Sequence, residues 1–220
     1  LLEEAYEAAE AIDNDDPVLL KEELGDVLMQ VVFHADIESD AGRFTMDDVC
    51  DGVVKKLLFR HPHVFGDGHE DSPESVLVSW EQLKRREKGQ KTVSDSMDSV
   101  ARSLPSLWRA EKLQKKAAAA GFEWPDVQGA LDKLEEEVAE LRRAVENGGD
   151  VPDELGDALL AAVKVGRFCG CDPEDAVNGT CEKFIHRFRA VEEGAAVRGR
   201  EVSQLSLEEM TALWDEAKRS

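Results

Sequence analysis

Two pairs of carboxylates, each spaced three residues apart, constrain this chain more than any other feature. The first pair is Glu137 and Glu140, and the second is Glu154 and Asp157. On a helix, this spacing places both side chains of a pair on one face. The sequence Asn-Gly-Gly-Asp at 147–150 is a strong turn signal between the pairs. The stretch therefore predicts two helices that fold back on each other and bring four acids to one seam.

Four carboxylates that face each other cannot all stay ionised without an energetic penalty. A hard divalent cation such as Mg2+ relieves that repulsion, because it prefers carboxylate oxygens as ligands. The alternative is structural, since glutamate-rich helices are common and a single E-x-x-E pair is usually a solvated face. Repetition of the pattern within the chain favours metal binding.

The same arrangement occurs near the N-terminus, where Glu4 and Glu7 precede Glu23 and Asp26. The correspondence continues downstream, in the same order and at nearly the same spacing. Lys56, Arg60, Trp80 and Lys84 correspond to Lys183, Arg187, Trp214 and Lys218. An internal duplication is the simplest explanation.

These motifs resemble those of a known family. E-E-x-x-E followed by E-x-x-D is the signature of the all-α nucleoside triphosphate pyrophosphohydrolases, and the tandem form is similar to the MazG proteins. The supporting stretches, which together extend over nearly the whole chain, include EEAYE, EELGDVLMQVVFHA, SWEQLKRREKG, EKLQKKAAAAGFEW and KFIHRF. The resemblance implies Mg2+-dependent hydrolysis of nucleoside triphosphates to the monophosphate and pyrophosphate, by homodimers.

A triphosphate bound at an acidic seam also needs cations from the protein. Lys133 lies one turn before Glu137 on the same face, and Lys183 shares a face with Arg187. The resemblance implies that these residues, with Lys218 and their N-terminal counterparts Lys56, Arg60 and Lys84, contact the triphosphate. The alternative is that they form surface ion pairs with the many glutamates. Trp214, with its counterpart Trp80, is a candidate for stacking on the base, although a core tryptophan explains it equally well.

The expected reaction is attack of a metal-activated water on the α-phosphorus. The acids Glu137, Glu140, Glu154 and Asp157 would hold the metal, and Glu4, Glu7, Glu23 and Asp26 would do so in the first copy. Glu136 is the candidate for orienting or deprotonating the water.

The predicted fold is all-α, with two tandem helical domains that each contribute to a metal site of the four-helix-bundle type. The domains are expected at 1–88 and 105–220, with an aperiodic linker at 89–104. The expected helices are 1–12, 18–39, 46–60, 72–88, 105–121, 126–146, 152–168, 172–191 and 206–218. Irregular segments are expected at 61–70 and 194–203.

Two features of the acid-bearing helices carry further expectations. The apolar stripe that includes Leu24, Leu28, Val32 and Ala35 is wide enough to predict a mostly buried helix. A glycine precedes an acid in the interior of each helix, at Gly25 and Gly156, although glycine disfavours helix by about 1 kcal/mol relative to alanine. This predicts close approach of a backbone or ligand, or tight helix packing.

Composition excludes several classes of partner. Asp and Glu number 48 against 27 Lys and Arg, a net charge of -21, which argues against nucleic acid and anionic membranes. No apolar run approaches the ~20 residues of a membrane span. Four cysteines without a C-x-x-C pattern suggest free thiols in a cytoplasmic protein.

Two other functions fit parts of the pattern: a catalytically silent module that binds nucleotides or proteins, and a purely structural acidic bundle. Intact acid pairs in both copies favour the enzyme. The second copy is expected to carry most of the activity, because the counterpart of Lys133 in the first copy would fall before Leu1. The chain starts at Leu1 within a helical pattern and without Met, so missing N-terminal sequence is expected.

Overall fold

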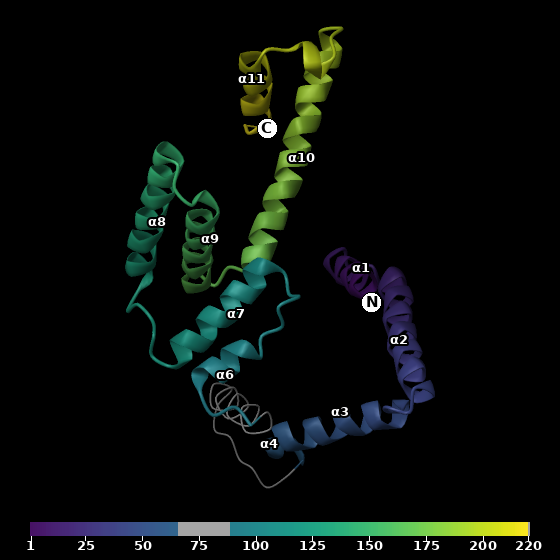
Figure 1. Cartoon of the computed structure of the whole chain (residues 1–220). Helices are drawn as coiled ribbons and strands as arrows, with labels where there is room; N and C mark the ends of the chain where they lie inside the picture. The colour runs from purple at the N-terminus through teal and green to yellow at the C-terminus, as the bar shows by residue number, and fades with distance from the viewer. Residues whose placement is uncertain (66–88, 220) are drawn as a thin grey trace. The chain divides into compact units, whose positions relative to one another are not determined.

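The computed structural model describes residues 1–65 and 89–219, and its regular structure within them is entirely helical (Figure 1). This confirms the predicted all-α class for the described residues. The chain forms two compact units, Leu1–Gly89 and Gln90–Ser220. The helix expected at 72–88, with Trp80 and Lys84, lies outside the described residues.

The first unit is built on a helix hairpin. Its helices are α1 (Leu2–Asp13), α2 (Pro17–Asp40), α3 (Met46–Arg60) and the short α4 (Pro62–Phe65). The carboxylate of Asp16 accepts hydrogen bonds from the N–H groups of Val18 and Leu19, both at 3.0 Å, and so starts α2. The small side chains of Ala8, Ala11 and Ala35 are buried. The hairpin therefore packs closely along one narrow strip only.

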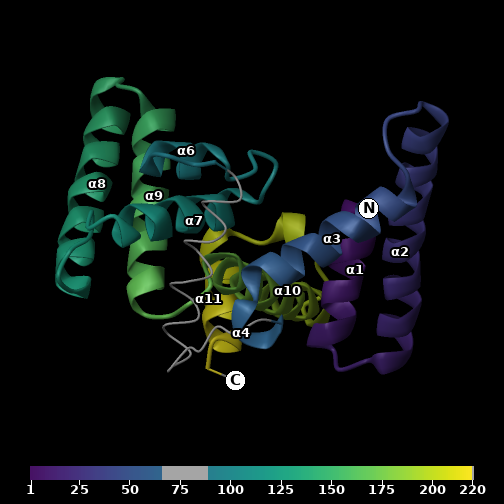
Figure 2. The same cartoon turned by 90° about the horizontal axis from the view of Figure 1, so that it is seen from below.

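The second unit contains a longer series of helices. They are α6 (Val93–Asp98), α7 (Ser106–Ala119), α8 (Val127–Asn147), α9 (Val151–Phe168), α10 (Pro173–Val197), the 3-10 turn η1 (Val202–Gln204) and α11 (Leu207–Ala217). Figures 1 and 2 show α8 and α9 side by side as a hairpin, and α7 packs across α9.

The turn between α8 and α9 follows from its glycines. Gly148 ends α8 in the left-handed region, with φ of 72°, where glycine is favoured because it lacks a Cβ. The N–H of Gly149 then donates to the carbonyl of Ala144 at 2.8 Å. Asp150 caps α9 through the N–H of Asp153 at 3.3 Å. The tight turn forces α8 and α9 to run antiparallel, as the sequence predicts.

Helix α10 is longer than the sequence predicts, because Gly194 does not end it. Val191 and Ala195 of α10 pack against Leu205 and helix α11 in a small core. A Cβ at position 194 would lie 2.4 Å from Cδ2 of Leu213. The glycine is therefore a point of close helix contact rather than a helix breaker, and α10 continues to Val197 through part of the expected irregular segment.

Two other expectations about regular structure are wrong. The segment expected as an aperiodic linker contains α6, whose capping box pairs Thr92 with Asp95. Within the stretch expected to be irregular after Arg60, α4 forms one turn of helix.

The apolar stripe of α2 is not mostly buried, contrary to expectation. Leu24 is 54% exposed, Leu28 58% and Val32 46%, and Ala35 alone among the stripe residues named is buried. A hairpin of two helices covers one side of each helix, so the remainder of a wide stripe faces outward. In the part of the chain that the structure describes, no helix combines the length and apolar character needed to cross a membrane.

Replacement of Gly194 by alanine should destabilise the contact between α10 and α11. The added methyl group would meet Cδ2 and Cδ1 of Leu213 at 2.4 and 2.7 Å, and overpacking of this kind costs about 1–3 kcal/mol. Gly179→Ala is the matched control on the same helix, where a Cβ meets nothing within 4 Å among the described residues. It should stabilise the protein by up to about 1 kcal/mol. Thermal unfolding followed by circular dichroism compares them, and equal melting temperatures would contradict the packing argument.

Candidate metal centre

The α8–α9 hairpin brings three of the four predicted acids of the second copy together. Carboxylate oxygens of Glu137, Glu140 and Glu154 all lie within 4.8 Å of one another. Because the helices are antiparallel, Glu137 and Glu140 on one face of α8 meet Glu154 in the first turn of α9. Asp157 is exposed and lies outside this set, but its charge acts on Glu154. The cluster is thus three acids at close range with a fourth nearby.

Glu137 carries the observation that fits a cation. Its side chain is buried, with a relative exposure of 6%, and its Oε2 atom has no hydrogen-bond partner among the described residues. Its other oxygen, Oε1, lies 2.7 Å from the ammonium group of Lys133. A buried carboxylate oxygen without a hydrogen-bond donor is destabilising. Such an oxygen is a suitable ligand for a hard cation. The donor set is therefore suited to Mg2+.

The neighbouring acids act on the pKa of Glu154. Burial raises the pKa of Glu154 above its ordinary value, and the charges of Glu140, Asp153, Glu137 and Asp157 raise it further. Both effects disfavour the ionised form. A divalent cation would reverse them, because it favours the ionised form of every acid in the cluster.

Two basic residues of α8 already offset part of this charge. Lys133 lies 2.7 Å from Glu137 and 2.9 Å from Glu136, and these two partners raise its pKa well above the ordinary value. Arg143 lies 2.9 Å from Glu140. Arg143 was not among the residues predicted for the site, although its i, i+3 spacing from Glu140 is a signal in the sequence. The candidate base Glu136 is exposed and held by Lys133.

The first copy repeats the geometry with more exposure. Carboxylate oxygens of Glu4, Glu7 and Glu23 lie within 4.8 Å of one another, but none of the three residues is buried. Burial raises the pKa of Glu23, with further contributions from Glu7, Asp26, Glu22 and Glu4. Asp26, like Asp157, lies outside the close set but acts on it.

The two glycines beside these acids face open space. A Cβ at Gly25 or at Gly156 would meet no atom within 4 Å among the described residues. Tight helix packing among the described residues therefore does not explain them, which argues against one of the two interpretations offered by the sequence. Close approach of a ligand or of another chain stays a prediction.

Two of the residues predicted to contact the substrate, Arg187 of α10 and Trp214 of α11, lie close to each other. The guanidinium of Arg187 lies 5.8 Å from the ring centroid of Trp214, and Phe184 meets the same ring edge-on at 4.9 Å. Trp214 also packs against the small core of α10 and α11, so part of its surface is structural. Lys218 lies 3.2 Å from Asp215, and Lys183 is exposed.

Arg187 lies on α10, whereas the acid cluster lies on α8 and α9. A helix rises by about 1.5 Å per residue, so Arg187 lies roughly 20 Å along α10 from its first residue, Pro173. In the first copy, Lys56 is exposed and Arg60 is half-buried.

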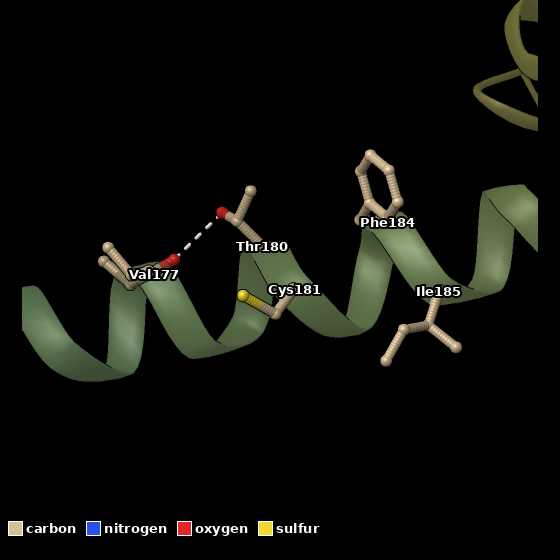
Figure 3. Close-up of a pocket in the computed structure, with 6 residues that line it drawn as sticks. Val177, Thr180, Cys181, Phe184 and Ile185 are labelled. Carbon is tan, nitrogen blue, oxygen red and sulfur yellow. Dashed lines mark hydrogen bonds between the residues drawn. The ribbon is translucent and has the colours of Figure 1, made fainter.

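An apolar groove runs along α10 near these residues. It has a volume of about 420 Å3 and is lined by Ala176, Val177, Thr180, Cys181, Phe184 and Ile185, all from this one helix (Figure 3). The hydroxyl of Thr180 donates to the carbonyl of Ala176 at 2.9 Å, so the lining presents little free polarity. All four cysteines, including Cys181, are exposed free thiols.

The fold and the acid clusters define the class of protein: an all-helical chain whose helix hairpins present candidate metal-binding carboxylates. Sequence comparison agrees with this class. The profile of the MazG nucleotide pyrophosphohydrolase domain matches residues 1–65 and 126–191, the segments that hold the two clusters. The chain belongs to the MazG family, which confirms the resemblance.

Relatives align over the whole chain. It is 42% identical to the nucleoside triphosphate pyrophosphohydrolase of Escherichia coli strain K12, over 99% of this chain and 84% of that protein. It is 41% identical to the nucleoside triphosphate pyrophosphohydrolase/pyrophosphatase MazG of Thermotoga maritima, over 99% of this chain and 83% of that protein. The uncharacterized protein YabN of Bacillus subtilis is 45% identical over 100% of this chain and 45% of its own length.

Glu154→Gln should stabilise the metal-free protein at neutral pH. A carboxyl group with a raised pKa holds its proton more tightly in the folded state, so its contribution to stability is lost as pH rises through that pKa. Glutamine removes this penalty, and the melting temperature should rise. The gain should shrink as pH falls toward about 4.3, the ordinary pKa of glutamate.

The exposed Glu135, outside the acid cluster, provides the control variant Glu135→Gln. Melting temperatures are measured in a chelating buffer over a range of pH. An unchanged or lower value for Glu154→Gln at neutral pH, relative to Glu135→Gln, would contradict the repulsion described above.

Proposed function

We propose that this chain hydrolyses nucleoside triphosphates, both ribo- and deoxyribonucleotides, to the monophosphate and pyrophosphate in a Mg2+-dependent reaction. Membership of the MazG family identifies it as a hydrolase of acid anhydrides. The relatives from E. coli and T. maritima carry the name of this activity. The single observation that carries the proposal is the buried Glu137 oxygen without a donor, set within 4.8 Å of two other carboxylates.

The acids would hold the metal, with Glu137, Glu140 and Glu154 as direct ligands and Asp157 beside them. When bound, Mg2+ supplies charge neutralisation for the phosphates and lowers the pKa of water. Glu136 would accept the proton from the attacking water. Attack on the α-phosphorus forms one P–O bond and breaks the bond to the pyrophosphate leaving group.

Cations of the chain would bind the phosphates. Lys133 would contact the triphosphate next to the acids, while Lys183, Arg187 and Lys218 would offer further positive charge. In the first copy Lys56, Arg60 and Lys84 would correspond. Trp214 would stack on the base, as would Trp80, which gives little discrimination because every base has a π-face.

The products of the reaction test this proposal directly. Incubation with ATP and Mg2+ should release AMP and pyrophosphate, separable by ion-exchange chromatography. Glu154→Gln should lower kcat by about 100-fold because a direct metal ligand is lost. Asp157→Asn should also lower kcat, because it removes a negative charge beside the metal, and helical content should stay unchanged in both variants. Release of ADP and orthophosphate would refute attack at the α-phosphorus. Absence of turnover with intact nucleotide binding would identify the silent binding module instead.

The second copy is expected to supply most of the activity. Glu137 is buried and paired with Lys133, whereas Glu4, Glu7 and Glu23 are all at least partly exposed. Lower solvent exposure strengthens the interactions between the carboxylates and a bound cation, because the local dielectric constant is lower. Glu154→Gln should therefore reduce kcat more than Glu23→Gln does in an otherwise identical protein. A larger loss from Glu23→Gln would reverse the assignment, and equal losses would show that both sites contribute.

A homodimer would cover the apolar surface that the hairpins leave open. Leu155 and Leu159 on α9 are 46% and 50% exposed, and Leu24 and Leu28 on α2 are 54% and 58% exposed. Two helix hairpins that pack face to face form a four-helix arrangement with these residues inside. The apolar groove on α10 adds further surface of the same kind. We therefore propose a second copy of this chain as the partner.

Light scattering at micromolar concentration should give twice the chain mass of 24.4 kDa. Leu159→Glu should shift the protein toward the monomer by placing a charge in the proposed interface. Leu207→Glu, at a site that is 74% exposed on α11, should leave the mass unchanged. A monomer mass for the wild-type chain would contradict the dimer and indicate that the two internal repeats of one chain pair with each other.

A further inference from the structure

The connector before α8 joins the two helices of the acid-bearing hairpin at the end opposite the turn. The carboxylate of Glu123 lies 3.2 Å from the ammonium group of Lys164 and also pairs with Arg167. Both partners belong to the last turns of α9, near the first turn of α8. The hairpin is therefore closed covalently at 148–150 and by ion pairs at its open end.

Trp124 contacts both helices at the same place. Its ring packs on Gly129 in the first turn of α8 so closely that a Cβ there would lie 2.3 Å from Cδ1. Lys164 of α9 lies 4.3 Å from the centroid of the same ring. The backbone N–H of Trp124 donates to Glu123 at 3.1 Å, which fixes the two connector residues relative to each other.

This contact is strongly desolvated. The side chain of Lys164 has a relative exposure of 9%, that of Arg167 14% and that of Glu123 21%. Burial lowers the pKa of Lys164, so the charged lysine is retained against a desolvation penalty. Breaking a buried ion pair by removing one partner is strongly destabilising. The junction is thus built to hold one geometry.

The acid cluster lies between the two closed ends of the hairpin. Glu137 is about 12 Å along α8 from Gly129, and Glu154 about 15 Å along α9 from Lys164, at roughly 1.5 Å per residue. A change in helix spacing at the open end would move the two sets of carboxylates apart. Mg2+ requires near-ideal geometry from its ligands, so small displacements would weaken its binding.

We propose that Glu123 and Trp124 are positioning residues that fix the open end of the α8–α9 hairpin and thereby hold Glu137, Glu140 and Glu154 at metal-binding distance. The inference rests on the proposed function, because it assumes that these acids bind the cation. Neither residue touches the substrate or the metal in this role.

Metal affinity of the nucleotide-free protein tests the role. Mn2+ binding is measured by the loss of the free-ion signal in electron paramagnetic resonance, with Glu23→Gln present throughout to suppress the first cluster. Glu123→Gln and Gly129→Ala should each weaken Mn2+ binding by about 10-fold, the lower end of the effect expected for residues that orient metal ligands. They should lower kcat similarly and leave KM for the nucleotide within about 2-fold. Trp124→Phe should preserve most of the affinity that Trp124→Ala loses.

The control is Glu111→Ala, which removes an ion pair of 2.7 Å with Lys115 within α7 and should leave Mn2+ binding unchanged. If Glu123→Gln does not fold, Gly129→Ala and the two Trp124 variants decide, because they retain every charge. Lower melting temperatures with unchanged Mn2+ affinity in these variants would overturn the positioning role and leave the connector a structural joint. Glu154→Gln separates the two proposals: retained Mn2+ binding in that variant would overturn the metal site itself and the positioning role with it.

Discussion

Repulsion between carboxylates across the α8–α9 hairpin is the constraint on which the rest of the second unit depends. Three acids share a space in which their oxygens lie within 4.8 Å, and burial disfavours the ionised form of Glu154. Nothing in the acids themselves keeps them together. The tight turn at 148–150, the crossing of α7 over α9 and the contacts of Glu123 must therefore supply the free energy that holds this arrangement.

The same constraint explains the outward-facing apolar surface. A hairpin that presents acids at its seam has only a narrow strip left for packing, and small residues such as Ala130, Ala144 and Ala158 occupy it. Larger side chains, including Leu155 and Leu159 of α9, remain about half exposed. Lys133 and Arg143 offset part of the acidic charge within the hairpin. The exposed leucines would be covered only by further helices packed against them.

Features that depend on residues close in the sequence were easier to predict than features that depend on tertiary contacts. Two local signals correspond to observed structure: the i, i+3 spacing of Glu137 and Glu140, and the glycine turn at 148–150. The sequence predicts an irregular segment from Gly194, whereas α10 continues to Val197, because the close contact of Gly194 with Leu213 is tertiary. The contacts of Glu123 with Lys164 and Arg167 join residues more than 40 positions apart. Pairs this far apart cannot be predicted from the periodicity of the sequence.

Lys133 provides a positive charge that allows the acid cluster to fold without a bound cation. Its ammonium group contacts Glu136 and Glu137 and offsets part of the charge at the seam. A divalent cation that binds to the free Oε2 of Glu137 would weaken the hold of that carboxylate on Lys133, because the two cations repel each other. The lysine would then be available to an anion beside the metal, which is where the proposed function places the triphosphate. One residue would thus offset part of the charge of the acid cluster and later bind the phosphates.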